Sequence, residues 1–116
     1  MRACSLIGLA AIASCAAPAA AHAFLQHADP GAGRRLTMAP TRVVLSFSEQ
    51  LEPTLSGAAI TDGSGRSVAA GAVAIRGKAM VAPVRPLRPG SYLVTWHVMS
   101  IDRHRTEGAY SFTVKP

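Results

Sequence analysis

Cysteine is scarce in this 116-residue chain, and both cysteines, Cys4 and Cys15, lie within the first 21 residues. A domain that begins at position 22 therefore contains none, which excludes a catalytic thiol, a disulfide and thiolate-bound zinc or iron–sulfur clusters. Charged residues make up only 16% of the chain, and the aromatic residues are three Phe, two Tyr and one Trp. Because the basic residues are scattered and few aromatics accompany them, we exclude a nucleic-acid-binding surface.

Long apolar runs are also missing, since no segment reaches the roughly 20 residues of a membrane-spanning helix. Residues 1–21 carry one charge, Arg2, then an apolar stretch at 6–13 and small residues after Pro18. This order is typical of a secretory signal. We predict that residues 1–21 are removed and that 22–116 is exported as a domain without membrane insertion. Loss of Arg2 lowers the formal net charge from +6 to +5.

The position of the cut decides which residue becomes the mature N-terminus. Cleavage after Ala21 makes His22 the first residue. Ala21-His22-Ala23 also satisfies the small-x-small rule, so a cut after Ala23, which would remove His22, stays open on cleavage rules alone. An uncleaved N-terminal membrane anchor is a further alternative.

Short runs of alternating apolar residues recur through the rest of the chain, with Gly and Pro between them. They predict strands at 43–48, 57–61, 73–75, 80–84, 91–99 and 109–114, with an edge strand from 24. Val43, Leu45 and Phe47 share one strand face, and Tyr92 stands where a tyrosine corner would open a strand. Since no helical period appears, the predicted fold class is all-β, a sandwich or small barrel of about seven strands.

Histidine and carboxylate side chains must then supply any chemistry. A mature N-terminal His22 offers its α-amine and ring Nδ1 to one metal ion, a chelate that suits the tetragonal N/O preference of Cu(II). Asp102 and His104 are spaced so that, in extended backbone, both side chains project to the same side. By itself this D-x-H pattern is weak evidence for a metal site, because two solvated loop residues would more often give it.

At this point the chain resembles a known family. The segment WHVMSIDRHRTEGAYSFTV at 96–114 is similar to the C-terminal signature of the CopC family of copper resistance proteins. The mature start HAFL at 22–25, followed by DPGAG at 29–33, and the segment FSEQLE at 47–52 are similar to other parts of that family. The resemblance extends from His22 to Val114 and implies a periplasmic, seven-stranded Greek-key β-sandwich or barrel (immunoglobulin-like or cupredoxin-like) that binds copper.

The resemblance also implies a Cu(II) site made by His22, through amine and ring, together with Asp102 and His104. Glu49 matches a carboxylate that some members place near the site as an axial or outer ligand; a strand-end surface charge is its alternative. Because the amine belongs to this site, membership favours cleavage before His22. Some members hold Cu(I) in a methionine-rich loop, whereas the methionines here are dispersed and are expected to fill the core instead: Met38, Met80 and Met99.

The function implied is capture of one Cu(II) by a monomeric carrier or chaperone in copper homeostasis and resistance, without catalysis. Family relatives act beside an inner-membrane copper transporter, which is the expected protein partner. Two other classes stay open: a copper-brace polysaccharide monooxygenase, and a metal-free immunoglobulin-like binding module. His97 is expected to face away from the Tyr92–Val98 row as an exposed or ligand-orienting residue, and His27 as a surface residue or alternative ligand.

Overall fold

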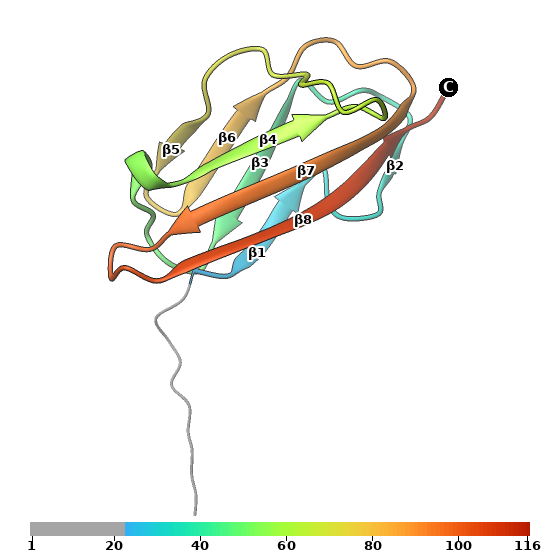
Figure 1. Cartoon of the computed structure of the whole chain (residues 1–116). Coiled ribbons are helices and arrows are strands. Elements are labelled where there is room, and N and C mark those ends of the chain that lie inside the picture. Colours follow the sequence, from blue (N-terminus) through green and yellow to red (C-terminus); the bar gives the residue numbers. More distant parts are fainter. Residues whose placement is uncertain (1–22) are drawn as a thin grey trace, which may run out of the picture.

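Segments with alternating apolar residues pair into two β-sheets in the computed structural model, which describes residues 23–116 (Figure 1). The predicted signal, its cleavage and His22 lie outside these residues. One sheet has the order β1-β3-β6-β5 and the other β2-β8-β7-β4. The strands are β1 (Leu25–Asp29), β2 (Arg35–Leu36), β3 (Arg42–Phe47), β4 (Gly57–Thr61), β5 (Ala74–Arg76), β6 (Ala79–Pro83), β7 (Gly90–Met99) and β8 (Arg105–Val114), and a short 3-10 turn, η1, covers Pro53–Leu55.

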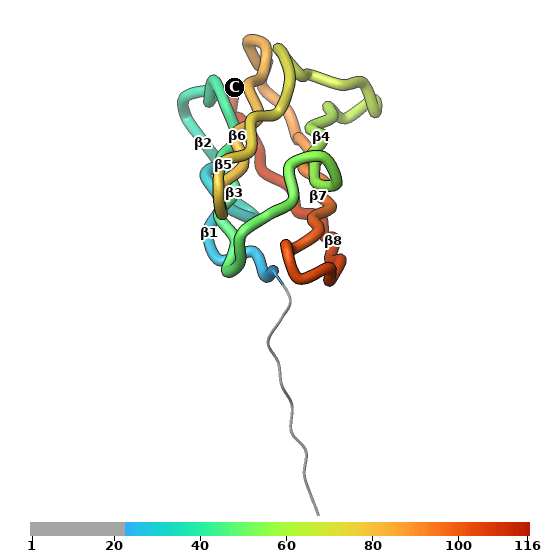
Figure 2. Tube along the Cα trace, turned by 90° about the vertical axis from the view of Figure 1, so that its left-hand side faces the viewer, coloured from blue at the N-terminus to red at the C-terminus, as the bar shows by residue number. Residues whose placement is uncertain are grey.

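The two sheets pack face to face, and Figure 2 shows β1, β3 and β6 in one layer and β4, β7 and β8 in the other. As predicted, Val43, Leu45 and Phe47 of β3 are buried, at 0–1% exposure. From the opposite sheet Trp96 meets Phe47 edge-on, with ring centroids 5.2 Å apart. Because every second residue of a strand points to the inner face of its sheet, the alternating apolar residues form the core between the two sheets. The all-β prediction is confirmed.

Two details differ from the sequence-based expectation. The two-residue strand β2 was not foreseen and raises the number of strands within residues 23–116 to eight. It pairs parallel with the end of β8. Strand β8 begins at Arg105 and not at 109, because β7 pairs with it without interruption from Gly90 opposite Val114 to Met99 opposite Arg105. Residues 105–108, which the sequence pattern assigned to a loop, therefore belong to the sheet, because their backbone pairs with that of β7.

The tyrosine corner is confirmed, since the Tyr92 hydroxyl donates a hydrogen bond of 2.5 Å to the carbonyl of Arg88. The methionines divide: Met80 is fully buried, as expected of core filler, whereas Met38 is 81% exposed. Met38 was therefore wrongly assigned to the core; it lies in the segment between β2 and β3, outside both sheets.

One end of the sandwich collects segments that are distant in sequence. The β7–β8 turn, the end of β3 and the start of β1 lie together there (Figure 1). Backbone hydrogen bonds join the segment after β3 to the β7–β8 end, from Glu52 to the carbonyl of Met99 (2.8 Å) and from Ile101 to that of Gln50 (3.1 Å). Ser48 in turn donates to the carbonyl of Phe24 at 2.8 Å, just before β1. Across residues 23–116 there is no helix with the length and apolarity to cross a membrane.

Candidate metal centre

The β7–β8 connection is a tight turn that carries Asp102 and His104. The N–H of Arg103 donates to the carbonyl of Ser100 at 2.8 Å, and the N–H of Ser100 donates to the carbonyl of His104 at 3.0 Å. Arg103 has a φ of 76°, a left-handed conformation uncommon outside glycine. The backbone is therefore bent between the two candidate ligands, and the expected extended geometry is wrong for this segment.

The bend nevertheless brings the two side chains together. Nδ1 of His104 lies 3.4 Å from Oδ1 of Asp102, and both side chains are about half exposed, at 47% and 45%. A hydrogen bond from the Ser100 hydroxyl, followed by the contact with His104, lowers the pKa of Asp102 below its usual value. An aspartate is ionised at neutral pH at its ordinary pKa, and the lowering extends to more acidic pH this ionised state, in which a carboxylate binds a metal.

Ser100 has a positioning role that sequence reasoning missed. It is fully buried, its hydroxyl contacts the Asp102 carboxylate, and it accepts the N–H of His104 at 3.2 Å. A buried hydroxyl two residues before an Asp is a local turn pattern that the sequence carries, but its burial depends on packing against residues 50–51.

The start of the described chain is attached beside this turn. Ala23 is fully buried, and its carbonyl accepts a 2.7 Å hydrogen bond from the hydroxyl of Thr106, two residues after His104. Phe24 pairs with Ser48 in both directions: its N–H donates to the Ser48 hydroxyl, and its carbonyl accepts the Ser48 N–H, each at 2.8 Å. Residues 23–24 are therefore held between β8 and the end of β3.

Glu49 lies between these two contacts. It follows Ser48, which pairs with Phe24, and precedes Gln50, whose carbonyl accepts the N–H of Ile101. Its side chain is half-buried. Within residues 23–116 no three His, Cys, Asp or Glu side chains form a group that could hold a metal, so Glu49 does not complete a three-ligand cluster with the Asp102–His104 pair.

The other two histidines lie on the strands. His97 is exposed in β7, with Glu107 of β8 on one side and Gly57 of β4 on the other, which confirms that it faces away from the core. A Cβ at Gly57 would lie 3.1 Å from the imidazole, so the ring packs over this glycine, where a side chain would crowd it. His27 is exposed in β1.

Fold and turn together define a class: a small two-sheet β-sandwich with an ionised carboxylate and an imidazole in contact at one end. The model of the CopC domain matches residues 25–115, and the chain belongs to the CopC family. The resemblance seen in the residues is therefore confirmed.

Relatives and solved structures agree with this membership. The chain is 41% identical over 100 residues to protein YobA of Escherichia coli K12, covering 82% of this chain and 80% of that protein. It is 38% identical over 107 residues to copper resistance protein C of Escherichia coli, covering 84% of each. The crystal structure of CopC from Methylosinus trichosporium OB3b superposes with a TM-score of 0.76 at 34% identity, covering 82% of this chain and 95% of that one.

A second solved structure, PcoC, is described as a methionine-rich copper resistance protein from Escherichia coli. It superposes with a TM-score of 0.71 at 37% identity, covering 82% of this chain and 100% of that one. The β-sandwich described above is thus the fold of the family.

Proposed function

We propose that this protein captures one Cu(II) ion at the end of the sandwich formed by the β7–β8 turn, and acts as a copper carrier in homeostasis and resistance. Membership of the CopC family supports a copper-related role, because its relatives include copper resistance proteins. The chemistry of the described pair supports the oxidation state, since imidazole and carboxylate suit Cu(II) whereas thioethers suit Cu(I). Met38, Met80 and Met99 are dispersed and form no methionine-rich loop.

The N-terminal ligand in this proposal is His22, released by cleavage after Ala21. The observation that carries the proposal is the anchoring of Ala23, whose carbonyl is bonded to Thr106. Consecutive Cα atoms are about 3.8 Å apart, so residue 22 starts one peptide from a point fixed beside β8. Its α-amine and Nδ1 would close a chelate ring on an ion that also meets His104.

Asp102 and His104 supply the second segment of the proposed site. Oδ1 of Asp102 is engaged by Ser100 and His104, and the second carboxylate oxygen is the one proposed to bind the ion. This arrangement resembles the carboxylate–histidine contacts that orient metal-bound imidazoles. Glu49 is proposed as an axial or outer ligand, because its segment contacts both Phe24 and the β7–β8 turn.

Capture and release are the whole of the proposed activity, and no catalytic step is assigned. We further propose that the export signal directs the mature protein to the periplasm and that the protein acts there as a monomer. An inner-membrane copper transporter is the proposed recipient or donor of the ion.

A competition titration with Cu(II) tests the chelate. Protein beginning at His22 is compared with protein carrying one added glycine before His22, which converts the amine to an amide. We expect binding at least about a hundredfold weaker in the extended form, equivalent to about 2.8 kcal/mol. Asp102→Ala and His104→Ala should also weaken binding, whereas the matched control His27→Ala should not.

The pH dependence provides a second readout. An α-amine has an ordinary pKa near 7.7–8.0, so protons compete with copper for it as the pH falls from about 8 to 6. Asp102, whose pKa is lowered, stays ionised over that range. Equal affinities of the two N-terminal forms, or a flat pH profile, would contradict the chelate.

A further inference from the structure

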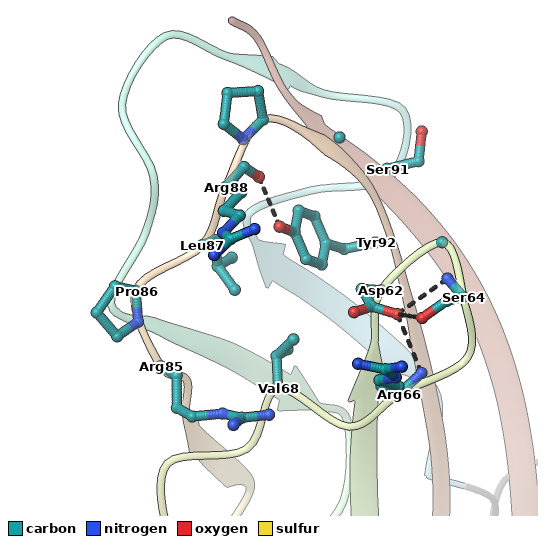
Figure 3. Close-up of a pocket in the computed structure, with 13 residues that line it drawn as sticks. Asp62, Ser64, Arg66, Val68, Arg85, Pro86, Leu87, Arg88, Ser91 and Tyr92 are labelled. Carbon is teal, nitrogen blue, oxygen red and sulfur yellow. Dashed lines mark hydrogen bonds between the residues drawn. The ribbon is translucent and has the colours of Figure 1, made fainter.

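A cavity opens at the other end of the sandwich from the Asp102–His104 turn. It lies between the turn after β4 and the connection from β6 to β7, and its volume is about 740 Å³ (Figure 3). β7 separates the two ends, since it starts at this cavity and its ten residues span about 30 Å. The cavity is therefore independent of the proposed copper site, and its size lies within the range of ordinary small-ligand sites.

Three arginines line the cavity: Arg66 from the first loop, and Arg85 and Arg88 from the second (Figure 3). None of them forms an ion pair in the part of the chain that the structure describes. Arg85 donates to the carbonyl of Ser67, which ties its guanidinium to the opposite loop. Planar guanidinium groups match the oxygens of phosphate with paired hydrogen bonds, which ammonium groups do not.

The cavity has one carboxylate in its lining, Asp62, and it is turned into its own loop. Its Oδ1 accepts the N–H and hydroxyl of Ser64, at 2.9 and 2.7 Å, and the N–H of Arg66 at 3.0 Å. These bonds, the Ser64 hydroxyl first, lower the pKa of Asp62. Even with this carboxylate ionised, three guanidinium groups leave a net positive charge in the cavity.

The cavity floor is apolar. Val68, Leu87 and Tyr92 are buried, at 8%, 9% and 5% exposure. The hydrogen bond from Tyr92 to the carbonyl of Arg88 fixes the backbone that carries one guanidinium. An apolar floor lowers the local dielectric and so strengthens attraction between the arginines and a bound anion.

The charges of the whole domain are arranged in the same sense. The carboxylates Glu49, Glu52, Asp102 and Glu107 lie at the end with the β7–β8 turn, where Arg76, Lys78, Arg103 and Arg105 balance them. The cavity end carries, besides the three arginines, the basic residues Arg34, Arg35, Arg42 and Lys115 against the carboxylates Asp29 and Asp62, and so stays net positive. A field of this polarity draws anions towards the cavity.

We propose that this cavity is a binding site for a tetrahedral oxyanion of the phosphate class, either free phosphate or the phosphate of a lipid headgroup. Arg66 and Arg88 bind the oxygens from two sides, and Arg85 contributes from the Ser67 side. Because three cations surround the site, a copper ion is repelled from it, and the two sites take ligands of opposite charge.

The test is a titration of the copper-free protein with inorganic phosphate at constant ionic strength, followed by amide NMR shifts. We expect saturable shifts confined to residues 62–68 and 85–92. Arg88→Gln and Arg66→Gln should each weaken phosphate at least about tenfold, the usual worth of a charge-assisted hydrogen bond. Arg42→Gln removes one charge from the same end outside the cavity, and is the matched control that should stay within about twofold.

The source of the phosphate is distinguished by vesicles. Binding to phosphatidylglycerol but not phosphatidylcholine vesicles, lost in Arg88→Gln, assigns a headgroup; saturable phosphate binding without vesicle binding assigns the free ion. No localised phosphate shift, or an equal loss of binding in Arg42→Gln, overturns the site, because diffuse charge would then account for any attraction. Unchanged backbone shifts elsewhere show that each variant is folded.

Discussion

The hydrogen bond between Thr106 and Ala23 provides the most direct test of how the fold serves the N-terminus. The Thr106 hydroxyl donates to the Ala23 carbonyl at 2.7 Å across 83 residues of sequence. Thr106→Val preserves the shape of the side chain and removes the donor. Ala23 is fully buried, so water does not readily replace that hydroxyl at the carbonyl.

The magnitude follows from the unsatisfied carbonyl. A buried polar group that loses its partner costs about 1–3 kcal/mol, and the better strand propensity of valine offsets a few tenths of that. We therefore expect the free energy of unfolding to fall by about 1–2 kcal/mol, or roughly 4–8 °C in Tm for each kcal/mol. Because the segment before β1 is then held in place less of the time, Cu(II) affinity should fall about threefold to tenfold.

The assay combines urea unfolding of the copper-free protein with a Cu(II) competition titration. Thr95→Val is the matched control, since the Thr95 hydroxyl reaches the carbonyl of Ala59 only at 3.5 Å, in a solvent-exposed contact. The control should change both quantities little. If Thr106→Val loses stability and keeps its full copper affinity, the bond stabilises the sandwich without positioning the N-terminus, and the reasoning is refuted.

Two further predictions concern the sheets. A Cβ at Gly108 would lie 2.5 Å from Cζ2 of Trp96, so Gly108→Ala should lower the free energy of unfolding by about 1–3 kcal/mol. The control Gly71→Ala, whose Cβ would have its nearest neighbour at 3.7 Å, should be neutral or slightly stabilising. Equal unfolding free energies of the two variants in urea would contradict the close approach at Gly108. Burial, and then the charge of Asp29, raises the pKa of Tyr110 to about 12, so its contribution to stability is complete below about pH 10 and is lost as the pH rises through 12. Tyr110→Phe should flatten that alkaline decline in unfolding free energy, and an unchanged decline would assign it to other groups.

Much of the fold was predictable because alternation is a local signal. Val43, Leu45 and Phe47 were expected on one face, and all three are buried. The start of β8 was missed for the same reason: 105–108 is polar or glycine, and only its partner strand β7 makes it a strand. A residue such as Gly108 then fits beneath Trp96, a requirement that no local pattern reveals.

The candidate site was predictable in its chemistry and less so in its geometry. Asp102 and His104 were expected to meet through an extended backbone, yet they meet across a tight turn with Arg103 at positive φ. Ser100 was missed, because its role depends on burial against the segment after β3. The proposed role of His22 rests on the sequence and on the anchoring of its neighbour Ala23.

Sequence alone determined the kinds of ligand atom, the absence of cysteine from the domain and the two faces of each strand, since these depend on residue type and local spacing. Tertiary structure alone decided which distant segments meet: Ala23 with Thr106, Phe24 with Ser48, and three arginines around one cavity. The physical reason is that the alternation of side chains is set by neighbouring residues within one strand. Which distant residues come into contact is set by the register between strands and by the conformation of the turns.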